Sequence, residues 1–330
     1  MIYLSAKDIK KVFSMRDAIE ADREALGLYS EGKTDIPLRT NIDITEQKGQ
    51  SLYMPGYVSG SSPALGEKIV SVYPKNIEKN LPSVPATMIA LDATTGIVNA
   101  ILDGTYLTQL RTGAVQGLAT ELLSKEDSKK GLLIGTGGQG MSQLEAMLTV
   151  RRLDVVFVFD IDKSRSEKFC EKATQLFKDN FETKFESIAN IDEILPQVDI
   201  ITSVTTSKEA TFNGDFIKKG VHINGVGAYT PEMHEIPESA LIKADHIFLD
   251  TNAGVLAEAG DIISPLKESV INKSDIDGEL GQLINNEKNG RKNNDEITIF
   301  KTVGTAALDV VVADRIVKLA VQKHIGMELK

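Results

Sequence analysis

A glycine-rich turn between two apolar runs is the stretch whose residue types and spacing most clearly indicate chemistry. The turn, Gly135-Thr136-Gly137-Gly138-Gln139-Gly140, follows the apolar run 132–134, and a segment with helical periodicity over 141–152 comes next. Glycines at its first, third and sixth positions suit a tight turn, a close approach of the backbone to a pyrophosphate, and close packing of a helix on a strand. The helix then directs its unpaired N–H groups at the phosphates. This pattern predicts a dinucleotide site.

An acidic residue closes the second apolar run. Asp160 lies 25 residues after Gly135, where a carboxylate can accept hydrogen bonds from both hydroxyls of a ribose. Because a 2′-phosphate would face this carboxylate, the sequence predicts NAD rather than NADP as the cofactor. Lys163 and Arg165 follow closely and could soften the preference, so NADP is not excluded.

Lys68 stands out because strand periodicity places it on the same face as Ala64, Val70 and Val72. A lysine on an apolar face either reaches solvent from a strand end or is held in a pocket for use. In a pocket, burial lowers the pKa of a lysine and makes it a candidate acid, base or carboxylate partner.

Two arginines could join this lysine at a carboxylate site. Arg111 lies in a predicted helix beside Leu110 and Ala114, and Arg39 falls on the polar face of a predicted strand. Taken singly, each is typical of a solvated arginine or of a surface ion pair. Both guanidinium groups together with Lys68 would bind a carboxylate bidentately, but sequence spacing does not decide whether they converge.

Composition and charge argue against several classes of function. The chain has 330 residues, of which 42% are hydrophobic and 25% charged, and its formal net charge is −10. These values are typical of a globular protein and disfavour nucleic acid or an anionic membrane surface as a partner. The four histidines are scattered without ligand spacing, so no metal is expected. No apolar run approaches the roughly 20 residues that span a bilayer, and a single cysteine suits a reducing compartment; we expect a cytoplasmic protein.

Two kinds of predicted secondary structure must position the candidate residues. Short β-rich runs over 37–102, separated by Gly, Ser, Asn and Pro, predict an antiparallel or mixed sheet. From 130 to 302 strands and helices alternate, which predicts an α/β fold with a doubly wound parallel sheet. The apolar helix predicted over 305–324 needs a partner surface, and we expect it to return to the N-terminal sheet.

Local signals predict where several helices begin and end. Ser5 and Ser14 are each followed three residues later by an aspartate, which predicts two helix N-termini. Gly32 supplies the stop for the second of these helices. Thr105 is expected to cap the helix that carries Arg111.

Several stretches over nearly the whole length resemble one known family. A Leu-Thr-x-x-Arg-Thr element contains Arg111, and a Lys-x-Val-Gly-x-Ala element follows at 301–306. The matching stretches are 37–40, 66–70, 107–114, 135–139, 258–261, 279–281 and 300–309. The chain thus resembles the ornithine cyclodeaminase/mu-crystallin family of NAD(P)-linked proteins, which includes ornithine cyclodeaminase, an archaeal-type alanine dehydrogenase and ketimine reductases.

The resemblance implies roles for individual residues. Arg39 and Arg111 would bind the carboxylate of the substrate, and Lys68 would both contact the substrate and act as the catalytic residue. The residues implied for cofactor binding are Thr112, Gly135, Thr136, Gly137, Gly138, Gln139, Asp160, Val204, Thr205, Val226, Val303 and Gly304. The resemblance also implies a homodimer, with an α+β substrate-binding and dimerisation domain over 1–118 and 306–330 and an NAD(P)-binding Rossmann domain over 119–305.

One turn departs from the cyclodeaminases. Those enzymes carry an aspartate in a Gly-Asp-Cys-Pro-type turn after the fifth Rossmann strand, and Tyr229 stands at that position here. A tyrosine, with a pKa of about 10, is not a carboxylate base at neutral pH, which disfavours deamination followed by ring closure. Tyr229 and His234 are conceivable proton partners, although surface turn residues are the simpler interpretation.

The function that we expect is an NAD(P)-dependent oxidoreductase of the C=N or CH–NH bond of small α-amino or cyclic α-imino acids. Such an imine reductase or amino-acid dehydrogenase needs a carboxylate held by arginine and a proton source such as Lys68. Two alternatives stay open. One is ornithine cyclodeamination, which yields proline and ammonia with NAD as a catalytic cofactor. The other is a dinucleotide-gated binding protein of the crystallin type, with little turnover.

Overall fold

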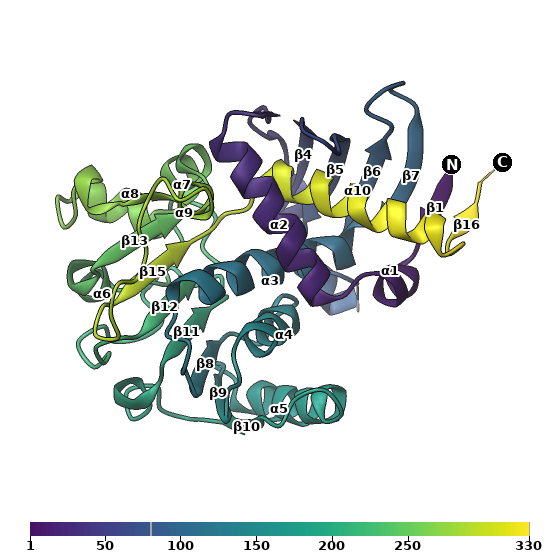
Figure 1. The fold of residues 1–330 in the computed structure, drawn as a ribbon. Helices are drawn as coiled ribbons and strands as arrows, with labels where there is room; N and C mark the ends of the chain where they lie inside the picture. Colours follow the sequence, from purple (N-terminus) through teal and green to yellow (C-terminus); the bar gives the residue numbers. More distant parts are fainter. Residues whose placement is uncertain (80, 330) are drawn as a thin grey trace. The chain divides into compact units, whose positions relative to one another are not determined.

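The computed structural model describes residues 1–79 and 81–329, and the chain folds into two compact units. Unit 1 comprises Met1–Arg111 and Thr305–Lys330, and unit 2 comprises Thr112–Gly304. The chain leaves unit 1 once and returns to it, so this unit is discontinuous in sequence. In Figure 1 the purple N-terminal segments and the yellow C-terminal helix belong to it.

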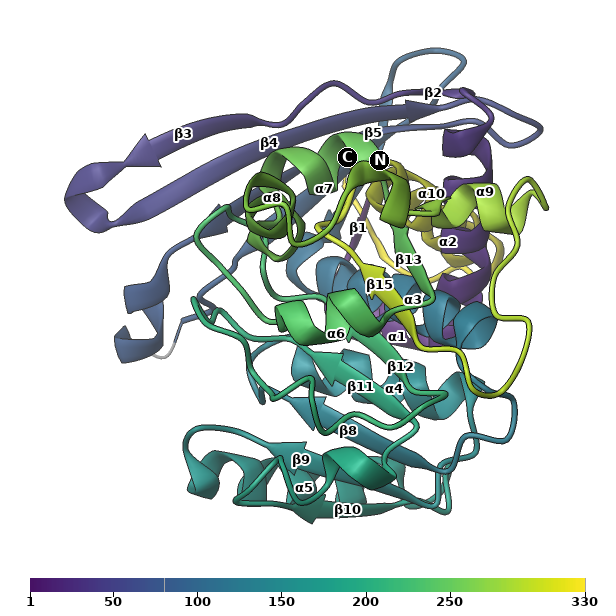
Figure 2. The same cartoon turned by 90° about the vertical axis from the view of Figure 1, so that its left-hand side faces the viewer.

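Unit 1 is built on an eight-stranded mixed sheet. β1 is parallel to β7, and the other neighbouring strands are antiparallel. The spatial order is β16 (Met327–Glu328), β1 (Ile2–Leu4), β7 (Val98–Asp103), β6 (Ala86–Leu91), β5 (Ala64–Val72), β4 (Gly49–Val58) and β2 (Thr34–Asp35), with β3 (Thr40–Ile44) paired to β4. Figure 2 shows β3 and β4 as a long ribbon at one edge. The expected mixed sheet is present, together with short strands β1, β2 and β16 that patterning did not reveal.

The helices of unit 1 follow the local signals closely. α1 (Ala6–Val12) and α2 (Met15–Ser30) both begin with a complete capping box, at Ser5 and Ser14. Gly32, after the end of α2, has a φ of +70°, which a glycine adopts without steric cost. The C-terminal helix α10 (Ala306–Gln322) packs on β4, β5, β6 and α2, as expected (Figure 1).

The cap predicted at Thr105 is wrong. The helix α3 (Gly104–Leu123) begins one residue earlier, and the carboxylate of Asp103 accepts a hydrogen bond from the backbone N–H of Tyr106 at 2.9 Å. The hydroxyl of Thr105 instead accepts from the backbone N–H of Ala86 on the neighbouring strand. Asp103 and Thr105 could each have capped this helix. Because Thr105 accepts a hydrogen bond from β6, Asp103 is the residue that caps it.

Unit 2 is built on an eight-stranded sheet in which all neighbouring strands are parallel. Its order is β10 (Lys184–Ser187), β9 (Val155–Phe159), β8 (Lys130–Ile134), β11 (Ile200–Ser203), β12 (His222–Gly225), β15 (Thr298–Lys301), β13 (His246–Leu249) and β14 (Gly278–Glu279). From β8 the chain first winds outward through β9 and β10 and then crosses to β11. The strand order therefore reverses between β8 and β11, the point at which doubly wound sheets bind ligands.

The remaining helices connect these strands. The α-helices of unit 2 are α4 (Gly140–Val150), α5 (Lys163–Phe177), α6 (Glu238–Lys243), α7 (Asn252–Glu258), α8 (Gly260–Lys267) and α9 (Leu280–Ile284). Four 3₁₀ helices complete the description: η1 (Thr45–Gln47), η2 (Pro74–Lys79), η3 (Leu195–Gln197) and η4 (Lys273–Asp275). Over residues 1–79 and 81–329, no helix has the length and apolar character that a membrane crossing requires.

Candidate active site

The glycine turn joins β8 to α4 at the carboxyl edge of the parallel sheet in unit 2. Gly135 has a φ of +102°, and a Cβ added there would lie 2.7 Å from the carbonyl oxygen of Val204. A Cβ at Gly140 would lie 3.0 Å from the carbonyl oxygen of Gly135. Gly137 is exposed, and a Cβ there would meet no heavy atom within 4 Å. Two glycines therefore close the turn, and the third leaves room where a pyrophosphate would approach the backbone.

Asp160 follows β9 directly and binds the same turn. Its Oδ2 accepts hydrogen bonds from the backbone N–H of Thr136, at 3.1 Å, and from the Thr136 hydroxyl. Its Oδ1 accepts from the backbone N–H of Asp162 at 3.1 Å. Burial opposes the charge of this carboxyl, but these hydrogen bonds and the nearby guanidinium of Arg165 outweigh burial and hold the pKa of Asp160 below its usual value. Asp160 is thus a charged acid held against the glycine turn.

The other residues expected at the cofactor lie along the same carboxyl edge. Val204 and Thr205 follow β11, Val226 follows β12, and Val303 and Gly304 follow β15. These strands are successive neighbours in the sheet, so their ends line one side of the point between β8 and β11 where the strand order reverses. Thr112, also expected at the cofactor, is half-buried on α3.

The start of α4 offers a polar surface that fits a dinucleotide. Gln139 occupies the N-cap position, and its Oε1 is buried without a hydrogen-bond partner among the described residues. Gly138 beside it is exposed. A ribose hydroxyl can donate to a free carbonyl oxygen, and phosphate oxygens accept from the unpaired N–H groups of a helix N-terminus. The residues present therefore suit the cofactor that the sequence predicts.

A residue that sequence reasoning missed, Glu235, joins two of the loops at this edge. One of its carboxylate oxygens accepts from the Ser203 hydroxyl at 2.8 Å and from the backbone N–H of Thr205 at 2.5 Å. The other accepts from the backbone N–H groups of Gly227, at 2.5 Å, and Ala228, at 2.9 Å. The side chain of Glu235 is fully buried, so it fixes the loop after β11 against the turn after β12.

Two further buried aspartates brace neighbouring segments. Asp250 accepts from the backbone N–H of Thr251 at 2.6 Å, and its second oxygen accepts from the Thr302 hydroxyl and from the backbone N–H groups of Val303 and Gly304. A separate aspartate, Asp261, accepts from two backbone N–H groups at 2.6 and 3.0 Å and forms an ion pair of 2.8 Å with a fully buried lysine on β15. The carboxyl edge of unit 2 is thus held by acids whose donors are mainly backbone groups.

Unit 1 contains a second buried group of charges. Lys68 on β5 and Arg111 on α3 are 1% and 6% exposed. The Nζ of Lys68 lies 2.8 Å from each carboxylate oxygen of Asp309, and the Nε of Arg111 lies 2.9 Å from Oδ1 of the same residue. The structure therefore brings Lys68 and Arg111 together, which excludes both a lysine that reaches solvent and an arginine in a surface ion pair.

These charges set the protonation of Lys68. Burial is the largest cause that lowers its pKa, and the guanidinium of Arg111 lowers it further. Asp309 acts in the opposite direction, through its charge and its hydrogen bonds, and the charge of half-buried Arg39 again lowers the pKa. The result is a pKa of about 7, which is suitable for transferring a proton near neutral pH.

Sequence reasoning missed two acids in this group. Asp309 lies 241 residues after Lys68, within a stretch that carried the family resemblance. Asp22 on α2 is fully buried, and neither of its oxygens has a hydrogen-bond partner in the described part of the chain. Burial raises the pKa of Asp22 well above its usual value, with Arg111 opposing this effect and Asp309 adding to it. The helical period could have revealed Asp22, because Ala18 and Ala25 on either side of it share its buried face.

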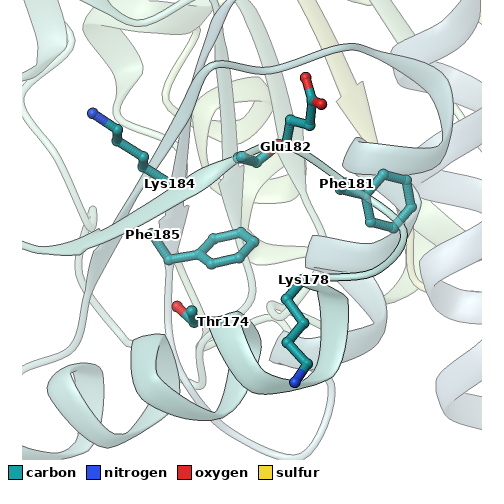
Figure 3. Close-up of a pocket in the computed structure, with 7 residues that line it drawn as sticks. Thr174, Lys178, Phe181, Glu182, Lys184 and Phe185 are labelled. Atoms are coloured by element: carbon teal, nitrogen blue, oxygen red, sulfur yellow. The ribbon is translucent and has the colours of Figure 1, made fainter.

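A pocket in unit 2 is separate from the glycine turn. It is lined by Thr174, Lys178 and Phe181 near the end of α5 and by Lys184 and Phe185 at the start of β10. Figure 3 shows the ring of Phe185 at its centre and the two lysine side chains pointing in different directions. Because the strands are parallel, the start of β10 lies at the amino edge of the sheet, opposite the turn. The pocket contains none of the groups described above.

Comparisons with known proteins agree over nearly the whole chain. The model of the ornithine cyclodeaminase/mu-crystallin family matches residues 1–324. A Delta(1)-pyrroline-2-carboxylate reductase of Bacillus cereus is 34% identical over 330 residues, with 100% of both chains covered.

Solved structures with the same fold also cover the full length. The Thermococcus litoralis Delta(1)-pyrroline-2-carboxylate reductase, in complex with NADH and L-proline, matches with a TM-score of 0.94 and 37% identity over 100% of each chain. An archaeal alanine dehydrogenase dimer with bound NAD matches with a TM-score of 0.90 and 31% identity, covering 100% of this chain and 99% of that one. These neighbours confirm the α/β fold class expected from the sequence. The chain therefore belongs to the ornithine cyclodeaminase/mu-crystallin family.

Proposed function

We propose that this protein uses NADH to reduce the C=N bond of a cyclic α-imino acid, with Δ1-pyrroline-2-carboxylate as the substrate and L-proline as the product. An oxidoreductase of C=N and CH–NH bonds is the class expected from the sequence, and the names of the full-length relatives confirm that class. The observation that carries the choice of chemistry is a buried lysine with a pKa of about 7 beside an arginine and an aspartate.

Unit 2 is the cofactor-binding part in this proposal. Gly135, Gly137 and the N-terminus of α4 would hold the pyrophosphate, and Asp160 would accept from the adenosine ribose. Structural neighbours that cover the full chain contain NADH or NAD, which supports the same cofactor here. When bound, the nicotinamide supplies the hydride for the reaction.

Unit 1 is the substrate-binding part. Arg111 and Arg39 would hold the carboxylate of the substrate, because guanidinium groups pair with carboxylates bidentately. Lys68 would donate a proton to the imine nitrogen while the adjacent carbon is reduced, so that one N–H bond forms as the Nζ–H bond of Lys68 breaks. The guanidinium groups of Arg111 and Arg39 both act on Lys68 as positive charges, which suits an anionic substrate.

Tyr229 argues against the cyclodeaminase alternative. It lies half-buried in the turn after β12, one residue beyond Ala228, whose N–H donates to Glu235. A tyrosine here removes the carboxylate base that the cyclodeaminases have. The binding-protein alternative leaves the buried pair of Lys68 and Asp309 without a role.

The proposal includes a homodimer in the cytoplasm. One full-length structural relative is a dimer. Near the β3–β4 ribbon of unit 1, Leu38 is 74% exposed and Ile42 50% exposed, and this apolar surface suits contact with a second copy. Dependence on NADH is consistent with a cytoplasmic enzyme.

A substrate screen tests the proposal. NADH oxidation is measured with Δ1-pyrroline-2-carboxylate, Δ1-piperideine-2-carboxylate, and pyruvate plus ammonia or methylamine, while ammonia release is measured with ornithine and NAD. We expect kcat/KM for a cyclic imine to exceed that for the open-chain substrates by about tenfold or more. Ammonia release from ornithine without net NADH would contradict the proposal in favour of cyclodeamination. Tight binding of NADH without turnover of any substrate would favour a binding protein.

A further inference from the structure

The contact between Lys68 and Asp309 has a geometry that a simple charge pair does not require. Both carboxylate oxygens of Asp309 lie 2.8 Å from Nζ of Lys68, and both side chains are almost completely buried. We propose that Asp309 is a positioning residue that aims the transferable proton of Lys68 at the substrate. This inference rests on the proposed role of Lys68 as the proton donor.

The number of N–H bonds on the lysine supports this assignment. A lysine ammonium has three N–H donors. The two oxygens of Asp309 are equally distant from Nζ and belong to one carboxylate, so they lie close together on one side of the ammonium. At least one N–H bond therefore points away from Asp309 and remains for the substrate nitrogen. After that proton leaves, the neutral amine still has N–H bonds for Asp309, and its lone pair occupies the direction of the lost proton. The same geometry thus serves Lys68 before and after proton transfer.

Other contacts keep Asp309 in place. It lies in the first turn of α10, where the positive end of the helix favours a carboxylate. Its Oδ1 is also 2.9 Å from Nε of Arg111. Because Asp309 is held from two sides, it can orient a lysine whose own long side chain is flexible.

The charges around Lys68 predict what loss of Asp309 would do. Arg111 from α3 and Arg39 from the segment before β3 both disfavour the protonated lysine, whereas Asp309 from α10 favours it. Asp22 from α2 faces Arg111 and Asp309. With Asp309 neutralised, the remaining cations would lower the pKa of Lys68 further.

The test is an Asp309→Asn variant, which keeps the shape of the side chain but removes its charge and one acceptor. The pH dependence of kcat/KM with Δ1-pyrroline-2-carboxylate and NADH is measured, and Lys68 is titrated directly by NMR in protein labelled at the lysine ε-carbon. We expect the alkaline decline of kcat/KM and the NMR pKa to move down together by about one pH unit or more, which leaves about tenfold less protonated lysine above the pKa. An unchanged NMR pKa and an unchanged decline would overturn the inference.

Two companion variants separate charge from orientation. Asp309→Glu keeps the charge but moves the oxygens, so we expect a nearly unchanged pH profile with a lower kcat; an unchanged kcat would count against positioning, and this variant serves if Asp309→Asn does not fold. Asp22→Asn is the matched control, because it exchanges a second buried acid of the same unit for an amide. We expect it to leave the pH profile in place, and a profile shifted as in Asp309→Asn would contradict a specific role for Asp309.

The outcome also distinguishes this inference from the proposed function. A Lys68→Met variant that kept the full rate would refute the role of Lys68 as proton donor. A Lys68→Met variant without activity, combined with an unshifted Asp309→Asn variant, would refute only the positioning role of Asp309.

Discussion

The buried carboxylates of the two units are compensated in different ways. In unit 2, Glu235 and Asp250 each accept four hydrogen bonds, three of them from backbone N–H groups. In unit 1, Asp309 accepts from the side chain of Lys68, and Asp22 is buried with no hydrogen-bond partner in the ranges that the structure describes. Glu235 and Asp250 of unit 2 thus have mainly fixed, neutral donors, whereas the equally buried Asp309 of unit 1 has a titrating cation.

The difference separates carboxylates that organise loops from those that take part in chemistry. Backbone N–H groups keep their protons near neutral pH, so the loops after β11, β12 and β15 are held by contacts that do not depend on a second titrating group. The ammonium of Lys68, with a pKa of about 7, changes charge in the range where an enzyme works. Buried charge is therefore a sign of function when its partner can change protonation.

The largest expected effect is the loss of rate in a Lys68→Met variant. Methionine fills a similar volume without a proton to donate, so kcat for the reduction of Δ1-pyrroline-2-carboxylate should fall by about 10²–10⁴-fold. Steady-state NADH oxidation measures this loss. Thermal unfolding of the same preparation shows whether the variant is folded. We expect it to fold, because Asp309 keeps Arg111 as a partner.

The matched control is Lys301→Met in unit 2. Lys301 is also fully buried and also paired with an aspartate, Asp261, at 2.8 Å. Removing one partner of a buried pair costs about 3–5 kcal/mol of the free energy of unfolding, so we expect a clear loss of stability and a much smaller loss of kcat in the folded protein. Equal losses of kcat in the two variants would remove the distinction between the units.

A Glu235→Gln variant should have the next largest effect. Each oxygen of Glu235 accepts two hydrogen bonds, so the amide nitrogen of glutamine must face two donors in either orientation. We expect a cost of about 1–3 kcal/mol in the free energy of unfolding and a rise of about tenfold in KM for NADH, with a smaller change in kcat. Urea unfolding and steady-state kinetics measure both quantities.

The control for this variant is Glu238→Gln, which makes the same exchange at an exposed position at the start of α6. It should change the free energy of unfolding by no more than about 0.5 kcal/mol. If Glu235→Gln matched this control in stability and in KM, the buried acid would not be organising the loops.

What the sequence could predict depended on how local each signal is. The glycine turn and Asp160 lie within one strand–turn–helix–strand unit, and their placement on the carboxyl edge follows from that pattern. The period of two along β5 placed Lys68 on the face that the structure buries to 1% exposure. The capping boxes at Ser5 and Ser14 involve residues three apart, so no tertiary contact was needed to recognise them.

The rest of the site depends on contacts that sequence spacing does not contain. Asp309 meets Lys68 across 241 residues, and its partners follow from the return of α10 to the sheet of unit 1. Glu235 lies in an irregular segment, and the groups that it binds come from two other loops. Thr105 shows the same limit on a smaller scale. Its hydroxyl accepts a hydrogen bond from the neighbouring strand, and Asp103 accepts the hydrogen bond at the start of the helix instead.

An Asp160→Ser variant tests the cofactor edge, with a smaller expected effect. Without the carboxylate, a 2′-phosphate would no longer meet a negative charge, and the guanidinium of Arg165, now 3.9 Å from Asp160 and 54% exposed, could approach it. We expect the ratio of kcat/KM for NADPH to that for NADH to rise by about tenfold. Asp162→Ser, two residues away, keeps a side chain that can cap α5 and should leave the ratio unchanged. A ratio that did not move in either variant would contradict the assignment of Asp160 to the ribose.

The smallest expected effect is that of an Asp22 substitution. It should stabilise the folded protein, whereas Glu235→Gln should destabilise it. Burial raises the pKa of Asp22 in the folded protein above the unfolded value of about 3.9. The folded state therefore binds a proton that the unfolded state releases as pH rises from about 4, so this group contributes less and less stability toward neutral pH. An Asp22→Asn variant has no carboxyl group to titrate at this position, so its stability does not decrease with pH for this reason. We expect it to be more stable than the unmodified protein by about 1 kcal/mol at about pH 8, with a smaller difference at about pH 5. Urea unfolding at the two pH values measures both differences. A variant that was less stable at both would mean that Asp22 is charged and stabilises Arg111, so that both acids of unit 1 would be compensated by cations rather than by backbone N–H groups.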